Sequence, residues 1–158
     1  MEILGQFDIN LRRALKEIDP NYDQHDALVI CGTTPEKDIT EADAEILIEK
    51  IRHARESGRP FLGICFGHQL TAIEVARSRG VENATSEEFG KGTFVVRRRP
   101  KLRVGLYGGE TWWSNYETFT DWQNPPHFIT VPYHPEYQSF KCRPHKVLTA
   151  FLKICTAK

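Results

Sequence analysis

A cysteine stands between two glycines in the middle of the chain, in the stretch Gly63-Ile64-Cys65-Phe66-Gly67. The short apolar run that ends at Ile64 has the length of a buried strand, and apolar residues recur at helical spacing from Leu70 onward. Cys65 is therefore expected where a strand turns sharply into a helix, which is the geometry of a nucleophile elbow with sulfur in place of oxygen. The two glycines remove side chains that would collide in so tight a turn.

An elbow of this kind would activate the sulfur of Cys65. The helix that begins after it points unpaired N–H groups and a partial positive charge at the sulfur, which favours the nucleophilic thiolate over the thiol. The backbone N–H of Phe66 would remain free to bind a developing oxyanion. The same pattern also fits a buried structural cysteine at a strand end, because cysteine is common in protein cores.

A histidine and a glutamate lie two residues apart near the C-terminus, in Tyr133-His134-Pro135-Glu136. The apolar run 128–131 predicts a strand directly before them, so the imidazole of His134 would emerge at the C-terminal edge of a sheet. There it can take a proton from Cys65 and later deliver it to a leaving amine. Glu136 can accept the other ring N–H and stabilise the imidazolium. A His-x-Glu sequence by itself also fits a surface turn.

The elements before the cysteine predict how these groups are positioned. The run 27–31 has the composition of a strand buried on both faces, and it ends at Gly32, whose N–H is a second candidate oxyanion donor. Thr40 and Asp43 form a capping-box-like start to an apolar helical stripe that ends at Gly58. Strand, helix, strand and helix with short links predict a doubly wound α/β fold with a mostly parallel sheet flanked by helices.

The second half of the chain has a different texture. After Gly80 it becomes polar and turn-rich, with short strand candidates at 94–96, 104–107 and 128–131, and a helical pattern over 146–154 covers the sheet. A basic cluster at 97–103 could hold phosphate or RNA, but the balanced charge of the chain favours a solvated strand edge, where charges prevent edge pairing. Trp112 and Trp113, which could also form a recognition surface, are interpreted as buried or half-buried aromatics.

Composition limits the class of protein. A chain of 158 residues fits one compact domain, residues 1–158, and its 21 basic and 21 acidic residues give no overall attraction to nucleic acid or a membrane. No apolar run is long enough to span a bilayer, and the N-terminus lacks a signal-peptide pattern. The cysteines have no C-x-x-C spacing, so a reducing cytoplasm is expected, with no metal or other cofactor.

Two motifs resemble those of a known family. The stretch 63–69 is similar to the nucleophile motif of class I (triad-type) glutamine amidotransferases, and 133–136 is similar to that family's second signature. The blocks 50–77, 84–89 and 134–139, followed by 143–144, narrow the resemblance to the amidotransferase domain of CTP synthases. This resemblance implies a flavodoxin-like fold and a catalytic triad of nucleophile Cys65, base His134 and orienting residue Glu136.

The resemblance also implies a substrate site, with departures. Gln69 and Glu88 fall on positions near the α-amino group of glutamine, and Tyr116 is retained in its segment. Asn115 stands where the family has the arginine that binds the substrate carboxylate. Replacing that cation by a neutral amide would weaken the binding free energy for the carboxylate by about 1.5–3 kcal/mol. The family's oxyanion loop, Pro-Gly-Gly-Phe-Gly, reads Cys31-Gly32-Thr33-Thr34-Pro35 here, without the aromatic residue.

The expected reaction is hydrolysis of a carboxamide C–N bond, with glutamine giving glutamate and ammonia. No synthetase half is present in the sequence, so a separate synthetase chain is a possible partner. Asn115 and Thr34 keep open another γ-glutamyl or small amide as substrate. A further alternative, from a different class, is a catalytically quiet regulatory or binding module that retains the triad. His68, on the first turn of the elbow helix, is interpreted as a packing or surface residue.

Overall fold

Four parallel strands form the centre of the molecule in the computed structural model, which describes residues 1–6, 8–33, 39–119 and 122–157. Their order in the sheet is β1-β2-β3-β7, with bounds Glu2–Leu4, Leu28–Ile30, Phe61–Ile64 and Phe128–Val131. Leu28 lies opposite Phe61, and Ile64 lies opposite Val131. The C-terminal ends of β2, β3 and β7 therefore meet at one edge, where ligands bind in open α/β sheets.

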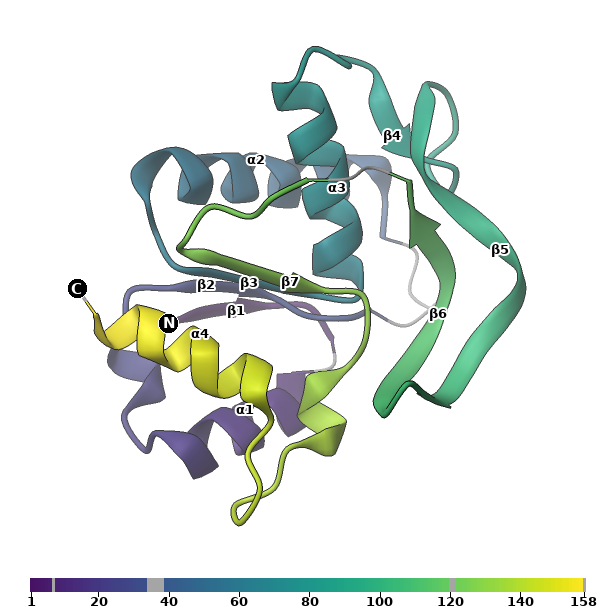
Figure 1. Cartoon of the computed structure of the whole chain (residues 1–158). Coiled ribbons are helices and arrows are strands. Elements are labelled where there is room, and N and C mark those ends of the chain that lie inside the picture. Colours follow the sequence, from purple (N-terminus) through teal and green to yellow (C-terminus); the bar gives the residue numbers. More distant parts are fainter. Residues whose placement is uncertain (7, 34–38, 120–121, 158) are drawn as a thin grey trace.

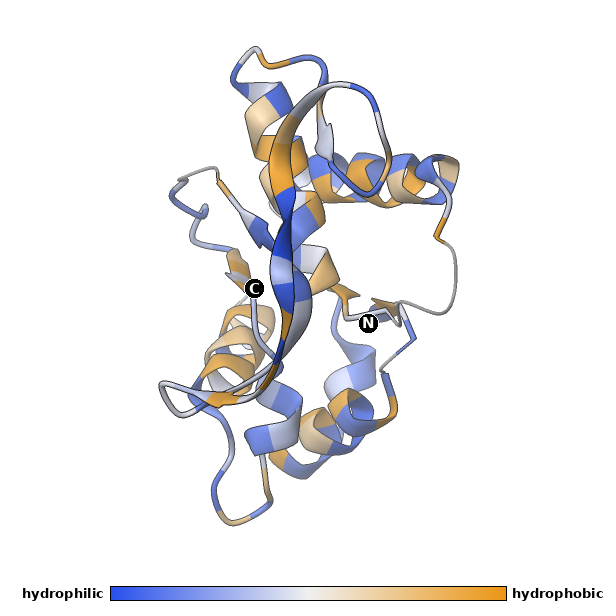
Figure 2. Cartoon of the chain, turned by 90° about the vertical axis from the view of Figure 1, so that its right-hand side faces the viewer, coloured by the Kyte–Doolittle hydropathy of each residue, from blue (hydrophilic) through white to orange (hydrophobic). Residues whose placement is uncertain are grey.

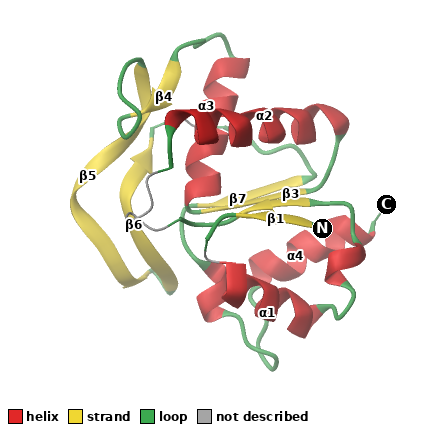
Figure 3. Cartoon of the chain, turned by 180° about the vertical axis from the view of Figure 1, so that it is seen from behind, coloured by secondary structure: helices red, strands yellow, loops and turns green. Residues whose placement is uncertain are grey.

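Helices cover both faces of this sheet (Figure 1). The helices α1 (Asp8–Ile18) and α4 (Lys146–Thr156) lie on one face, and α2 (Glu41–Ser57) and α3 (Phe66–Ser78) lie on the other, as the view from behind also shows (Figure 3). The predicted capping box at the start of α2 is present: the N–H of Asp43 donates to Thr40 Oγ1 over 3.1 Å. This arrangement confirms the predicted doubly wound α/β fold. No helix in the described ranges is long and apolar enough to cross a membrane.

A second, smaller sheet packs beyond α3. Its strands are β4 (Ala84–Ser86), β5 (Thr93–Tyr107) and β6 (Glu110–Thr118), in the order β4-β5-β6. The antiparallel pair β5–β6, here called the ribbon, bends along one side of the molecule, and its middle is hydrophilic (Figure 2). Because α3 lies between the two sheets, it is buried around most of its circumference.

The ribbon differs from the sequence-based expectation. The segments 94–96 and 104–107 belong to one strand of 15 residues, and β6 was not anticipated as a strand. The stretch between those segments is rich in arginine and has no alternation of apolar and polar residues, so its sequence does not indicate a strand. It is extended because β5 pairs with β6, with a register shift between Arg98 and Arg103. Strand propensity is weak evidence wherever a partner strand decides the conformation.

Candidate active site

Cys65 occupies a sharp turn between β3 and α3. Its backbone has φ 53° and ψ −97°, and it is the one non-glycine residue with a positive φ in the described part of the chain. A Cβ placed on Gly67 would lie 2.2 Å from the carbonyl oxygen of Ile30, so the turn closes only with glycine there. Strained backbone of this kind clusters at functional sites.

The sheet brings His134 to Cys65. The N–H of Cys65 donates to the carbonyl oxygen of Val131 over 2.9 Å, which ties the elbow to the end of β7. His134 follows three residues later and is buried, with Nδ1 2.7 Å from Glu136 Oε1. Glu136 is itself buried, on the short 3₁₀ helix η2 (Pro135–Gln138). His134 also forms a hydrogen bond with Cys65, so the three side chains lie next to one another.

The surroundings of His134 favour its protonated form. Burial alone would lower its pKa, but hydrogen bonds to Cys65 and to Glu136 outweigh burial and raise the pKa to about 10. In general, a protonated imidazole beside a cysteine sulfur stabilises the thiolate form, which is the nucleophilic one.

The two candidate oxyanion donors lie at the same edge of the sheet as Cys65. Gly32 follows β2 and is buried, and its carbonyl oxygen accepts the N–H of Gln6 over 3.0 Å. Phe66 is the first residue of α3, where backbone N–H groups have no acceptor within the helix. Thr34, invoked above for an alternative substrate, lies outside the described residues.

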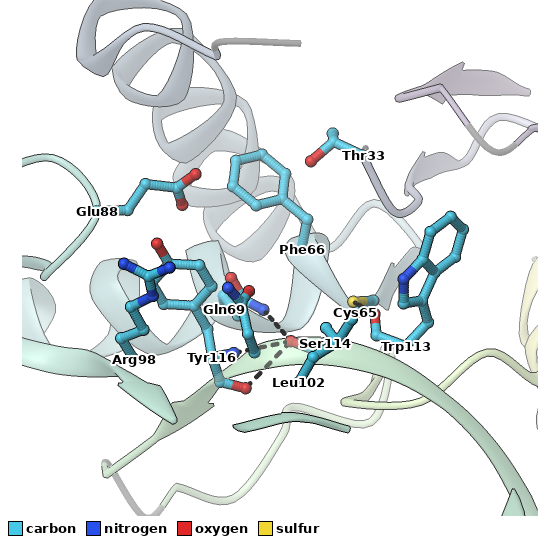
Figure 4. A pocket seen from close by; sticks show the side chains of 11 residues that line it. Thr33, Cys65, Phe66, Gln69, Glu88, Arg98, Leu102, Trp113, Ser114 and Tyr116 are labelled. Atoms are coloured by element: carbon cyan, nitrogen blue, oxygen red, sulfur yellow. Dashed lines mark hydrogen bonds between the residues drawn. The ribbon is translucent and has the colours of Figure 1, made fainter. Parts of the chain in front are cut away.

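A cavity of about 220 Å³ opens beside the sulfur of Cys65 (Figure 4). Four residues named above as substrate-binding candidates line it: Gln69, Glu88, Asn115 and Tyr116. Gln69 is buried, and its Nε2 donates to Ser114 Oγ over 3.2 Å. His134 and Glu136 are not among the described residues that line this cavity.

The ribbon supplies two contacts to the site that the sequence did not reveal. The carbonyl oxygen of Trp113 lies 3.6 Å from Cys65 Sγ. Arg98, interpreted above as part of a solvated edge, lines the cavity. It lies opposite Tyr116 in the β5–β6 register, and cross-strand partners share a face of a sheet. That register was the missing signal, because β6 had not been identified as a strand.

The rest of the basic cluster has no direct place in the site. Arg99 forms an ion pair with Glu117 at 2.6 Å, and the guanidinium of Arg97 lies 5.1 Å from the centre of the Phe119 ring. Arg97 and Lys101 are exposed, as predicted for a solvated strand, whereas Arg99 is partly buried; Arg98 is exposed as well, but it also lines the cavity.

His68 joins the two sheets instead of facing the cavity. Its Nδ1 lies 3.1 Å from Thr130 Oγ1 on β7, and its Nε2 lies 3.3 Å from Thr118 Oγ1 on β6. Burial lowers the pKa of His68 to about 4, which keeps the ring neutral. This is the packing role expected from the sequence. Within the described ranges, no group of three His, Cys, Asp or Glu residues could hold a metal ion.

Comparison with known proteins shows which family the chain belongs to. The family described as "Glutamine amidotransferase class-I" matches residues 6–124, and the chain belongs to that family. Within it, the chain is similar to CTP synthases. That of Dictyostelium discoideum is 45% identical over 85 residues, covering 51% of this chain and 15% of the relative. That of Thermosipho africanus is 28% identical over 200 residues, covering 87% of this chain and 37% of the relative. The chain thus spans well under half of these relatives.

A solved structure supports the fold. The glutaminase domain of Trypanosoma brucei CTPS with bound acivicin superposes with a TM-score of 0.75 at 17% sequence identity, over 99% of this chain and 93% of that chain. The match confirms a mostly parallel α/β sheet flanked by helices. The resemblance to the amidotransferase domain of CTP synthases is likewise confirmed by these relatives.

Proposed function

We propose that the chain hydrolyses a carboxamide through Cys65, His134 and Glu136, with glutamine as the substrate and glutamate and ammonia as products. The observation that carries the proposal is the strained elbow of Cys65 held against a buried His134–Glu136 pair. Membership of the glutamine amidotransferase family and the likeness to CTP synthases favour glutamine over other amides.

Two acyl-transfer steps account for the reaction. The thiolate of Cys65 attacks the amide carbon, and the N–H groups of Phe66 and Gly32 stabilise the oxyanion. His134 donates its proton to the departing nitrogen, which leaves as ammonia, while Glu136 keeps the ring oriented. His134 then takes a proton from water, the water attacks the thioester, and glutamate and the Cys65 sulfur are released.

A turnover assay with matched cysteine variants tests this proposal. Purified protein is incubated with glutamine, and both ammonia and glutamate are measured for the wild type, Cys65→Ala and Cys142→Ala. Cys142 is exposed and lies outside the cavity, so its variant controls for loss of a thiol in general. We expect equal amounts of the two products from the wild type and Cys142→Ala, and none above background from Cys65→Ala. Ammonia release that survives Cys65→Ala would contradict the mechanism.

Labelling separates the remaining alternatives. A glutamine-like chloroketone should modify Cys65 and spare Cys142, as read by peptide mass spectrometry. Labelling of Cys65 without glutamine turnover would point to a different amide, the alternative that Asn115 raises. A Cys65 that neither turns over glutamine nor reacts would favour a quiet binding module.

A further inference from the structure

The far end of the cavity carries opposite charges. Among the described residues that line it, Glu88 and Arg98 are the two charged ones, and Figure 4 shows both across the cavity from Cys65. Both act electrostatically on Tyr116, which also lines the cavity. The cavity of about 220 Å³ is smaller than the roughly 300–1,000 Å³ typical of sites for drug-sized ligands. It suits a small metabolite with one positive and one negative group.

Arg98 is held in place by its backbone. Its N–H donates to Glu87 Oε2 over 2.7 Å, and its strand position is opposite Tyr116. Its guanidinium makes no ion pair or hydrogen bond with the part of the chain that the structure describes. Arg99, one residue along, faces the other way and is paired with Glu117. Arg98 therefore offers an unused planar cation to the cavity, a group that suits bidentate binding of a carboxylate.

Glu88 offers the complementary group. It is exposed at the mouth of the cavity, yet the desolvation it does experience raises the pKa of its carboxyl. Within the described ranges its carboxylate has no cationic partner, since none of the ion pairs there includes it. A substrate ammonium would supply that partner and offset the cost of desolvation.

We propose that Arg98 binds the α-carboxylate of the substrate, opposite Glu88, which the family resemblance already places near the α-ammonium, so that the two charges together select an α-amino acid carrying a side-chain amide. The inference rests on the proposed function and deepens it. Asn115, on β6, leaves the carboxylate without the arginine expected there, and Arg98 supplies a cation from the neighbouring strand β5. The positive charge that binds the carboxylate is thus on β5 in this chain, where the family has it on the segment that corresponds to β6.

Kinetics with two substrates test this role. Ammonia release is measured from L-glutamine and from L-glutamine methyl ester, which lacks the carboxylate, for the wild type, Arg98→Ala, Arg98→Lys and Arg97→Ala. We expect Arg98→Ala to raise KM for glutamine about 10- to 100-fold, the effect of losing a charge-assisted hydrogen bond, with kcat within about threefold. KM for the ester should not change, and Arg98→Lys should recover part of the loss. Arg97→Ala, an exposed neighbour over Phe119, should match the wild type.

Two results would overturn the inference: an unchanged KM for glutamine in Arg98→Ala, or an equal rise for both substrates. Binding of glutamine to Cys65→Ala and to Cys65→Ala/Arg98→Ala, measured by calorimetry, separates this inference from the proposed reaction. Weaker binding in the double variant supports the role of Arg98 even if the wild type releases no ammonia. Equal binding, or none to either protein, overturns it.

Discussion

The C-terminal edge of the central sheet, through Cys65 and the loop after β2, and the ribbon both contribute residues to one cavity, yet they are built differently. The sheet is buried, its strands pair in unbroken parallel register, and its edge carries Cys65 and His134. The ribbon has many exposed residues and a register shift between Arg98 and Arg103, and it carries Tyr116 and Asn115. In the proposed reaction Cys65 and His134 exchange a proton, so their distance must stay within hydrogen-bond range, and a buried sheet edge holds it there.

Recognition of charge tolerates more variation. A carboxylate can be bound from either strand of a ribbon, provided that the cation reaches the same point. In our proposal Arg98 does what an arginine at position 115 would otherwise do. In this proposal, the residues at the sheet edge that carry out the reaction must keep fixed positions. The ribbon residues that recognise the substrate must mainly keep the right charge. Three predictions test this contrast.

The largest effect is expected at the buried end of the proposed triad. Glu136→Gln should lower kcat by about 10⁴-fold, because the amide no longer stabilises the imidazolium or selects the right tautomer. Glu117→Gln removes a carboxylate from the ribbon, where it pairs with Arg99, and should change kcat less than about threefold. Glutamine turnover, with circular dichroism to check folding, measures both. A kcat of Glu136→Gln within tenfold of the wild-type value would contradict the idea that the buried sheet edge is the more constrained region.

An intermediate effect is expected from glycines. Gly67→Ala places a Cβ 2.2 Å from the Ile30 carbonyl oxygen and should lower the free energy of unfolding by about 3 kcal/mol, because two backbone segments must separate. Gly109→Ala, at the tip of the ribbon with φ 82° and open space around it, should cost about 1 kcal/mol from backbone strain alone. Urea denaturation compares the two. Equal losses would mean that the elbow is no more rigid than the ribbon tip.

The third effect is absent at neutral pH and appears only in acid; it concerns His68, which joins the ribbon to the central sheet. Its pKa is lowered from 6.5 to about 4 in the folded protein, so the unfolded chain binds more protons between these values. The stability contributed by neutral His68 is present above pH 6.5 and is lost as the pH falls toward 4, at up to about 1.4 kcal/mol per pH unit.

Urea denaturation at pH 7 and pH 4.5 measures this loss. His68→Gln can keep contacts with Thr118 and Thr130 without titrating, so it should lose less stability on acidification than the wild type. His53→Gln, on the exposed face of α2, is the control and should follow the wild type. Identical pH dependence in all three proteins would show that His68 does not couple the ribbon to the sheet through its neutral state.

Local patterns in the sequence were sufficient for much of the fold. The apolar runs before Gly32 and Cys65 predicted buried strands, and the cap at Thr40 and the end at Gly58 predicted α2. These features depend on residues close together in the chain, whose burial and backbone preferences are encoded by their own spacing. The elbow could be predicted for the same reason, since both glycines lie within two residues of the cysteine.

The ribbon could not be predicted in this way. The segment 97–103 is charged and exposed, and it is extended because β6 pairs with it. The place of Arg98 in the cavity followed from that pairing, because a one-residue change in register would turn its side chain to the other face.

The amino-acid sequence alone therefore determined the types and spacing of the proposed reacting groups and most of the elements that carry them. Tertiary structure alone decided which of them meet. β7 lies beside β3 and presents His134 to Cys65, and β5 pairs with β6 and turns Arg98 toward the cavity. The physical reason is that contacts between distant segments depend on how whole elements pack, and local periodicity carries little information about that.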